Sequence, residues 1–143
     1  VCSSDLLLQR RDEVGLTEVL QMENIGYLPY SPLAFGMLSG KYLYNRKPEN
    51  ARVTLFPNYS RYSGKLSFRA TEKYAEIAKK FELSLPQLAL AFVNSRSFVT
   101  SNIIGATTLA QLEENIGSIN VTLSEEMLSE IEKVHQQIPN PAP

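Results

Sequence analysis

The sequence predicts an α/β fold in which short buried strands alternate with amphipathic helices. Two apolar runs, IGYLPYSPL at residues 25–33 and NIIGA at residues 102–106, are each followed by turn residues and then by a helical pattern. Such alternation is typical of βα units in a parallel sheet. Two parallel strands cannot form a covered sheet of their own, so the sequence also predicts that further strands come from elsewhere.

Several stretches have the three- and four-residue spacing of apolar side chains that is typical of amphipathic helices. The clearest start is at Ser84, an N-cap residue followed by Pro86 in the first turn and by Gln87 as in a capping box. The tail PNPAP cannot continue a helix and should be extended. Helices are therefore expected from residue 12 to 22, from about residue 67, after Ser84, at residues 109–116 and after Ser124.

Composition and charge exclude some classes of protein. The chain has 143 residues, 43% of them hydrophobic and 20% charged, with a net charge of −1, which is typical of a soluble globular protein. The near-zero charge argues against a nucleic-acid partner, and the sequence has no apolar run of about 18 residues for a membrane span. No secretory signal is recognisable, and we expect a cytoplasmic protein. A metal site is not expected, because His135 and Cys2 are the only residues of their types.

The first six residues, VCSSDL, have neither a helix nor a strand pattern. Read back into codons, they can be encoded by a common short sequencing adapter. We therefore expect residues 1–6 to be non-native, with a genuine short disordered N-terminus as the alternative.

The stretch GATTLAQLEENI, residues 105–116, has the features of an anion site at the start of a helix. Gly105 allows a ligand to approach the backbone closely, and Thr107 or Thr108 can cap the helix that follows. Free N–H groups and the helix dipole at such an N-terminus favour a phosphate group.

Polar side chains on that helix could bind the rest of a nucleotide. Gln111 and Asn115 carry donors and acceptors that suit an adenine edge, and Glu114 can accept from an amine or a ribose hydroxyl. The alternative from spacing alone is a plain capped surface helix, since polar residues usually face water.

The stretch PYSPLAFGMLSGKY, residues 29–42, also carries side chains that could bind a nucleotide. Tyr30 offers a flat face for stacking, and Ser31 offers a hydroxyl donor. Lys41 and the planar fork of Arg61 suit a phosphate monoester, although both could equally be solvated surface charges. The segment from Gly36 to Gly64 is long for a structureless loop, and such loops are often functional. Neither of the common glycine-rich phosphate loops is present.

The strings YSPLAFGMLSGKY, YSR and GATTLAQLEENIGSI resemble the C-terminal half of an aldo-keto reductase. They are most similar to the branch that holds the Tas-type bacterial reductases and the potassium-channel β subunits. The resemblance implies that residues 7–143 are the C-terminal part of one (β/α)8 TIM-barrel domain, with its seventh and eighth strands and their helices. It also implies NADP(H) bound across the C-terminal face of the barrel.

By that resemblance, Tyr30 would stack on the nicotinamide ring. Two positions depart from the channel-subunit pattern, since Tyr30 replaces a Trp and Phe35 replaces a Cys, and both keep an apolar contact. The remaining positions carried over are Ser31, Pro32, Leu33, Ala34 and Phe35 along the pyrophosphate; Lys41, Tyr59 and Arg61 at the phosphate end; and Gly105, Thr107, Gln111, Glu114 and Asn115 around the adenosine with its 2′-phosphate.

The family's catalytic group of Asp, Tyr, Lys and His has no matching motif in this chain. Tyr27, Tyr30, Lys41 and His135 are not those residues, and the group is expected upstream. The resemblance implies an NADPH-dependent reductase of small aldehydes or ketones, of which this chain alone would be inactive. The alternatives are a non-catalytic NADPH-binding regulatory subunit and a self-contained two-strand domain. No protein partner can be named.

Overall fold

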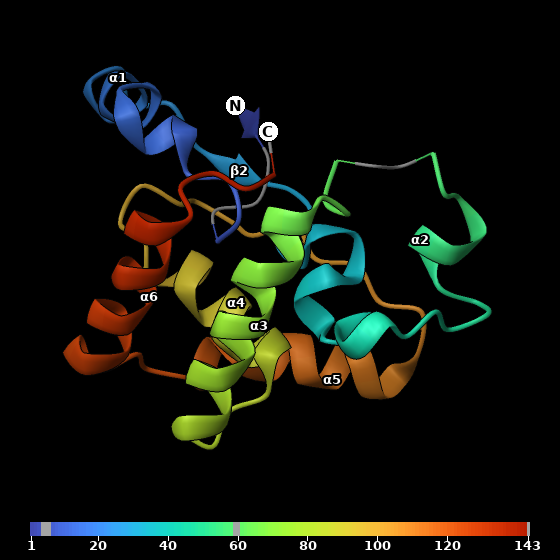
Figure 1. Cartoon of the computed structure of the whole chain (residues 1–143). Coiled ribbons are helices and arrows are strands. Elements are labelled where there is room, and N and C mark those ends of the chain that lie inside the picture. The colour runs from blue at the N-terminus through green and yellow to red at the C-terminus, as the bar shows by residue number, and fades with distance from the viewer. Residues whose placement is uncertain (4–6, 59–60, 143) are drawn as a thin grey trace.

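The computed structural model describes residues 1–3, 7–58 and 61–142, and it shows a helix-rich α/β arrangement (Figure 1). Helices α3, α4 and α6 form its body, while α1 and α2 lie at opposite ends. The elements are β1 (Cys2–Ser3), the 3-10 helix η1 (Arg11–Val14), α1 (Leu16–Met22), β2 (Leu28–Pro29), η2 (Ala34–Ser39), η3 (Leu43–Asn45), α2 (Arg52–Leu55), α3 (Lys65–Lys80), α4 (Leu85–Asn94), α5 (Leu109–Gly117), η4 (Ser118–Asn120) and α6 (Glu125–Gln137).

The two expected apolar segments do run side by side and parallel. Tyr27 bridges Val99 and Tyr30 bridges Ile103, with the Ile103 N–H donating to the Pro29 carbonyl at 2.9 Å. The prediction of a regular strand at residues 102–106 is wrong, however, because this segment makes only isolated bridges. One cause is local: with Asn102 before them and Gly105 after them, Ile103 and Ile104 are too few to sustain a ladder.

The second strand of the described sheet is β1, which the sequence did not predict. Cys2 pairs with Leu28 and Ser3 with Pro29 in parallel register, so β2 lies between β1 and the bridging segment. Most of VCSSDL is polar or small, so its pairing could not be recognised from a pattern of apolar residues. The hypothesis that residues 1–6 are non-native stays a prediction.

The helices form where the sequence predicted them, with one break. Gly15 adopts a φ of 137°, which separates η1 from α1 within the expected helix at residues 12–22. Ser84 caps α4 with the full capping box: its Oγ accepts from the Gln87 N–H at 3.2 Å, and the Gln87 side chain accepts from the Ser84 N–H at 3.1 Å. Ser124 caps α6 with a single hydrogen bond, which its Oγ accepts from the Met127 N–H at 3.2 Å.

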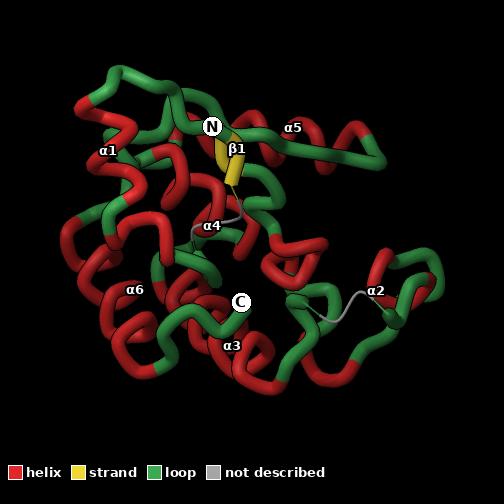
Figure 2. Tube along the Cα trace, turned by 90° about the horizontal axis from the view of Figure 1, so that it is seen from above, coloured by secondary structure: helices red, strands yellow, loops and turns green. Residues whose placement is uncertain are grey.

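The core lies between α3, α4 and α6. Tyr74 of α3, Phe92 of α4 and Ile131 of α6 are at most 1% exposed. The C-terminal tail closes one side (Figure 2): Ala142 N–H donates to the Leu8 carbonyl at 3.3 Å, and Ser67 Oγ donates to the Pro141 carbonyl at 2.9 Å. The tail is therefore anchored to both the N-terminal segment and α3.

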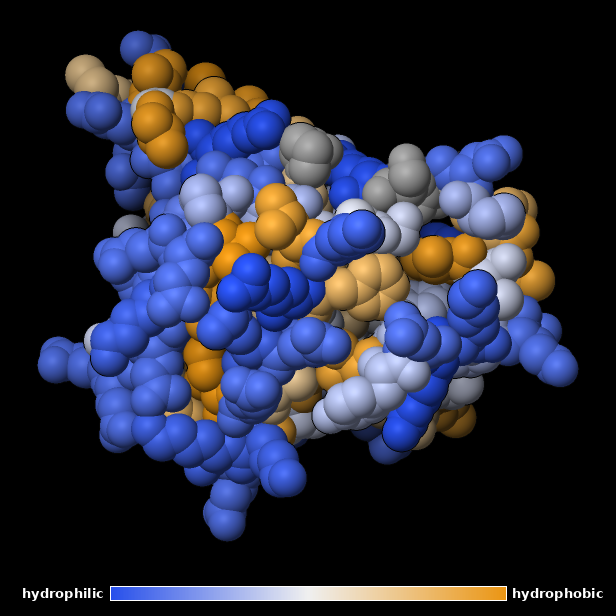
Figure 3. Space-filling view, in the orientation of Figure 1, coloured by the Kyte–Doolittle hydropathy of each residue, from blue (hydrophilic) through white to orange (hydrophobic). Residues whose placement is uncertain are grey.

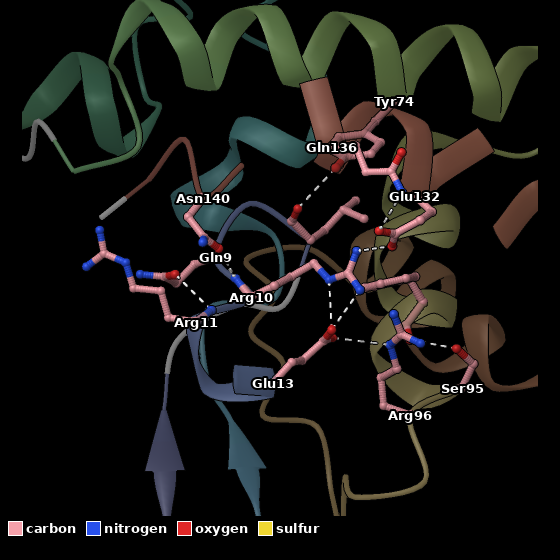
Figure 4. A network of polar contacts seen from close by, with 12 residues as sticks. Gln9, Arg10, Arg11, Glu13, Tyr74, Ser95, Arg96, Glu132, Gln136 and Asn140 are labelled. Atoms are coloured by element: carbon pink, nitrogen blue, oxygen red, sulfur yellow. Dashed lines mark hydrogen bonds and ion pairs between the residues drawn. The ribbon is translucent and has the colours of Figure 1, made fainter. Parts of the chain in front are cut away.

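A network of ion pairs crosses the same core (Figure 4). Arg10 pairs with Glu13 and with Glu132 of α6, each at 2.7 Å, and Arg96 approaches Glu13 at 3.5 Å. Both guanidinium groups lie over the Phe92 ring, with Cζ 5.4 Å and 4.2 Å from its centroid. The hydrogen bond from Arg10 holds the pKa of Glu132 below its usual value. We call these four charged residues the ion network.

Apolar side chains gather on the surface around α1. Val14, Val19 and Met22 are more than half exposed, and Figure 3 shows the corresponding hydrophobic surface over this helix. Within the part of the chain that the structure describes, no helix combines the length and the hydropathy that crossing a membrane requires.

Candidate functional site

The two motifs singled out in the sequence follow parallel segments that lie side by side. The bridge between Tyr30 and Ile103 sets these residues side by side, and both segments run in the same direction. The turn after Tyr30 and the loop leading to α5 therefore leave from the same edge. Loops at the carboxyl edge of parallel strands are the usual place for ligand sites in α/β proteins.

The first loop, residues 31–36, has an unusual backbone. Ser31, Ala34 and Phe35 have φ angles of 58°, 49° and 54°, in the left-handed region that non-glycine residues seldom adopt. Ala34 N–H donates to the Ser31 carbonyl at 2.7 Å, and the fully buried Ala34 side chain fixes the turn. Left-handed non-glycine residues each cost on the order of 1–3 kcal/mol and cluster at ligand-binding sites.

Aromatic and cationic side chains follow this turn. Arg61 Nη1 donates to the Tyr30 hydroxyl at 3.5 Å, which brings together two residues that are 31 positions apart. The Arg61 guanidinium lies over the Tyr62 ring at 5.3 Å, and that ring meets Phe35 edge-on at 4.9 Å. Tyr59, also expected in the site, lies outside the described residues.

Lys41 is held close to the turn. Its Nζ is 5.4 Å from the centroid of the Tyr42 ring, and its side chain lies so near Gly36 that a Cβ there would come within 2.5 Å of Lys41 Cε. The φ of 90° at Gly36 favours a glycine, whereas the end of the flexible Lys41 side chain could move away from a Cβ. Burial, and secondly the charge of Arg52, lower the pKa of Lys41.

The start of α5 is organised by its own side chains. Thr108 is the residue that caps the helix, its Oγ1 accepting from the Gln111 N–H at 3.2 Å. The Gln111 oxygen accepts from the backbone N–H and from the hydroxyl of Thr107, both at 3.0 Å. All three residues are exposed, so the Gln111 amide group is presented at the surface next to the loop. A Cβ on Gly105 would meet no atom within 4 Å, so the space beside it is open.

Glu114 and Asn115 face the protein. Asn115 is 4% exposed and its Nδ2 donates to the Gly105 carbonyl at 3.2 Å, while Glu114 accepts a hydrogen bond from the Ser84 hydroxyl. In this arrangement Asn115 fixes the loop that ends at α5, and Glu114 joins α5 to α4. Their direct contact with an adenosine stays a prediction.

Sequence reasoning missed Arg52, whose guanidinium lies over the Phe35 ring with Cζ at 5.3 Å from its centroid. Arg52 opens the short helix α2 inside the irregular segment between Gly36 and Gly64. That segment has no hydrophobic periodicity that could have placed an arginine near the turn, and no signal in the sequence separates Arg52 from its exposed neighbour Arg46.

A comparison with protein families identifies the class to which this fold and site belong. The model of the aldo/keto reductase family matches residues 3–136, and the chain therefore belongs to this family.

Individual relatives agree with that assignment. The chain is 50% identical over 137 residues to Protein tas of Escherichia coli K12, which covers 96% of the chain and 40% of the relative. It is 42% identical over 117 residues to an aldo-keto reductase of Babesia bovis, covering 78% of the chain and 41% of that protein. It is also 33% identical over 137 residues to the L-glyceraldehyde 3-phosphate reductase of Escherichia coli K12, covering 92% of the chain and 39% of the relative. The chain thus spans about 40% of the length of these relatives.

Proposed function

We propose that this chain is the cofactor-binding C-terminal part of an NADP(H)-dependent aldo-keto reductase that reduces small aldehydes or ketones to alcohols. The observation that carries the proposal is that the two motif loops leave from neighbouring parallel segments, with Lys41 and Arg61 beside one loop and α5 after the other. Membership of the aldo/keto reductase family supports the proposal, and so does the fact that the chain spans only 40% of the length of Protein tas.

The proposed placement of the chain is the last quarter-turn of a (β/α)8 barrel. Residues 27–30 would be its seventh strand and residues 99–103 its eighth, which fits their parallel bridges. Barrel enzymes place their sites at the carboxyl ends of the strands, where both loops of this chain emerge.

In the proposed complex, Tyr30 stacks on the nicotinamide and residues 31–35 follow the pyrophosphate. Lys41 and Arg61 bind phosphate oxygens, and Gln111 presents its amide to the adenosine. The cofactor supplies the hydride, so these residues contribute binding, orientation and charge compensation. Burial and the charge of Arg52 lower the pKa of Lys41, and a bound phosphate would act in the opposite direction by favouring the charged form.

The described side chains are better suited to binding a cofactor than to catalysing the reaction. Tyr27 is buried and donates to Asp12 Oδ2 at 2.8 Å, and burial, together with this hydrogen bond, raises its pKa. A phenol acting as a proton donor near neutral pH needs the opposite shift. His135 lies on α6, and burial lowers its pKa. The catalytic Asp, Tyr, Lys and His of the family are therefore proposed to lie upstream.

The experiment is a steady-state assay of the full-length protein with NADPH and a series of small aldehydes. We expect many NADPH molecules to be oxidised per protein molecule, in a manner that depends on the aldehyde. Tight NADPH binding with at most a single turnover would favour the regulatory-subunit alternative. No NADPH binding would contradict the proposal altogether.

A second experiment uses the isolated polypeptide of residues 1–143. It should be poorly soluble or only partly ordered, because open strand edges and apolar surface around α1 promote association. It should bind NADPH weakly and reduce no aldehyde. A monodisperse monomer with one sharp unfolding transition, or aldehyde-dependent NADPH oxidation, would show that the chain is self-sufficient. A cytoplasmic location and a small carbonyl substrate complete the proposal.

A further inference from the structure

Four polar side chains beside the loop that leads to α5 are joined by one continuous chain of hydrogen bonds. Asn102 Nδ2 donates to Asn94 Oδ1 at 3.2 Å, and Asn94 Nδ2 donates to Ser118 Oγ at 3.4 Å. Ser118 Oγ donates to the Asn115 carbonyl at 2.6 Å, and Asn115 Nδ2 donates to the Gly105 carbonyl at 3.2 Å. We call Asn94, Asn102, Asn115 and Ser118 the amide chain. Because it begins at residue 102 and ends at Gly105, it ties both ends of this short segment to the neighbouring helices.

The amide chain connects the loop to the core. Asn94 is the last residue of α4, and Val93 before it is fully buried. Asn115 lies on α5 and Ser118 opens η4, with exposed fractions of only 4% and 2%. Hydrogen bonds that are shielded from water are electrostatically stronger than exposed ones. The amide chain therefore fixes Gly105 relative to α4.

Packing within the described residues does little to fix this loop. Residues 103–110 are all exposed, and a hollow of about 320 Å³ lies between the segment before the loop and the end of α5 with η4. A Cβ added to Gly105 would meet no atom within 4 Å. The position of the loop depends instead on hydrogen bonds: the Ile103 N–H donates to the Pro29 carbonyl on one side, and the amide chain reaches the Gly105 carbonyl on the other. Breaking the amide chain should therefore allow the loop to move.

We propose that Asn94 and Asn102 are positioning residues for the adenosine end of the cofactor, acting through Asn115 and the Gly105 carbonyl without touching the ligand. The inference rests on the proposed cofactor site and adds to it two residues that the family resemblance does not include. A binding loop that is held in its bound geometry before the ligand arrives loses less conformational freedom on binding, which raises affinity. NADPH and NADH share the adenosine, so both should depend on the amide chain, whereas Arg61 should matter mainly for NADPH.

Asn120 offers a matched control. It lies two residues after Ser118 at the end of η4, and its side chain is exposed. Among the described residues, none is a hydrogen-bond partner of its side chain. Replacing Asn120 therefore removes a side chain of the same type close to the amide chain but leaves the hydrogen bonds of that chain intact.

The test measures dissociation constants of NADPH, NADH and adenosine 2′-monophosphate for the full-length protein and its variants. We expect Asn94→Ala and Ser118→Ala each to weaken all three ligands about fivefold. The double variant should also lose only about fivefold, and not about twenty-fivefold, because either change alone already breaks the amide chain. Asn120→Ala should alter no constant by more than about twofold. Asn102→Ala, which breaks the first bond of the amide chain, replaces Ser118→Ala if that buried substitution prevents folding.

Urea unfolding of each variant distinguishes a positioning role from a purely structural one. Lower stability with unchanged dissociation constants, additive losses in the double variant, or the same loss in Asn120→Ala would each overturn the positioning role. If the wild type binds NADPH and Arg61→Ala weakens it, but Asn94→Ala does not, only this inference is wrong. If the wild type binds neither cofactor, the proposed function fails, and this inference fails with it.

Discussion

Two groups of cationic side chains in this molecule have opposite surroundings. In the ion network, Arg10 and Arg96 lie among carboxylates and over one buried phenylalanine. At the candidate site, Lys41 and Arg52 lie beside aromatic rings, without an acidic partner among the described residues. Both groups are held by the fold, but among the described residues only the first has carboxylates at ion-pair distance.

The difference shows how to distinguish the cationic side chains that stabilise this fold from those that are suited to binding a ligand. A buried cation with its acids in place contributes to holding elements together, and removing it leaves those acids uncompensated. A group of cations without acids contributes little to stability and is suited to an external anion. Substitutions in the first group should therefore change unfolding, and those in the second should change cofactor affinity.

The largest effect is expected from Arg10→Ala in the full-length protein. The side chain of Arg10 is 9% exposed, and its loss would leave Glu13 and Glu132 without their main partner. We expect the free energy of unfolding to fall by about 3 kcal/mol, measured by urea denaturation. Arg52→Ala, measured in parallel, should change it by less than about 0.5 kcal/mol. A similar loss in both variants would remove the distinction between the two groups.

The next largest effect is expected at Arg61, which belongs to the candidate site and not to the ion network. Arg61→Ala should weaken NADPH binding by roughly 1.5–3 kcal/mol, or about ten- to a hundredfold, because a charge-assisted contact to the 2′-phosphate is lost. NADH binding, titrated by the same fluorescence change, should respond much less. Equal weakening of both cofactors would mean that Arg61 does not bind the 2′-phosphate.

The smallest effect is the pH dependence of the ion network. Arg10 holds the pKa of Glu132 below its ordinary value of 4.5, so the pair stabilises the fold above that pH and loses its contribution as pH falls through the lowered pKa. Because 43% of the Glu132 side chain is exposed, the contribution should be below about 1 kcal/mol.

The matching experiment compares unfolding of the wild type and Glu132→Gln at neutral pH and at several acidic values. The stability difference between the two should be greatest at neutral pH and should shrink as the solution becomes more acidic than the ordinary pKa of the carboxyl group. A difference that grows on acidification would show that Glu132 is not stabilised as a carboxylate.

The sequence predicted the parts of the fold that depend on near neighbours. Ser84 and Gln87 lie three residues apart, and their capping box needs no other part of the chain. The parallel run of the two apolar segments was also predictable, from the alternation of strands and helices. The strand at Cys2–Ser3 was not, because its pairing depends on Leu28 and Pro29 and not on its own side chains.

The candidate site was predictable to the extent that its motifs are local. The resemblance identified Lys41 and Arg61 from strings of adjacent residues, and their roles stay predictions. The burial of Asn115 depends on the Gly105 carbonyl ten residues away, and the place of Arg52 depends on a long irregular loop. Neither the solvent exposure of a helical side chain nor the path of such a loop follows from spacing alone.

The hydroxyl of Ser84 has a consequence for ligand affinity. It caps α4 and also donates to Glu114, on the helix that follows the second loop. If Glu114 must change its rotamer to accept from a ribose hydroxyl, its hydrogen bond from Ser84 is lost, and the two hydrogen bonds then exclude each other. The bond to Ser84 would be subtracted from the binding free energy, at a cost of about 1 kcal/mol or roughly a fivefold loss of affinity. The affinity of the adenosine end would then be limited by a competitor built into the protein itself.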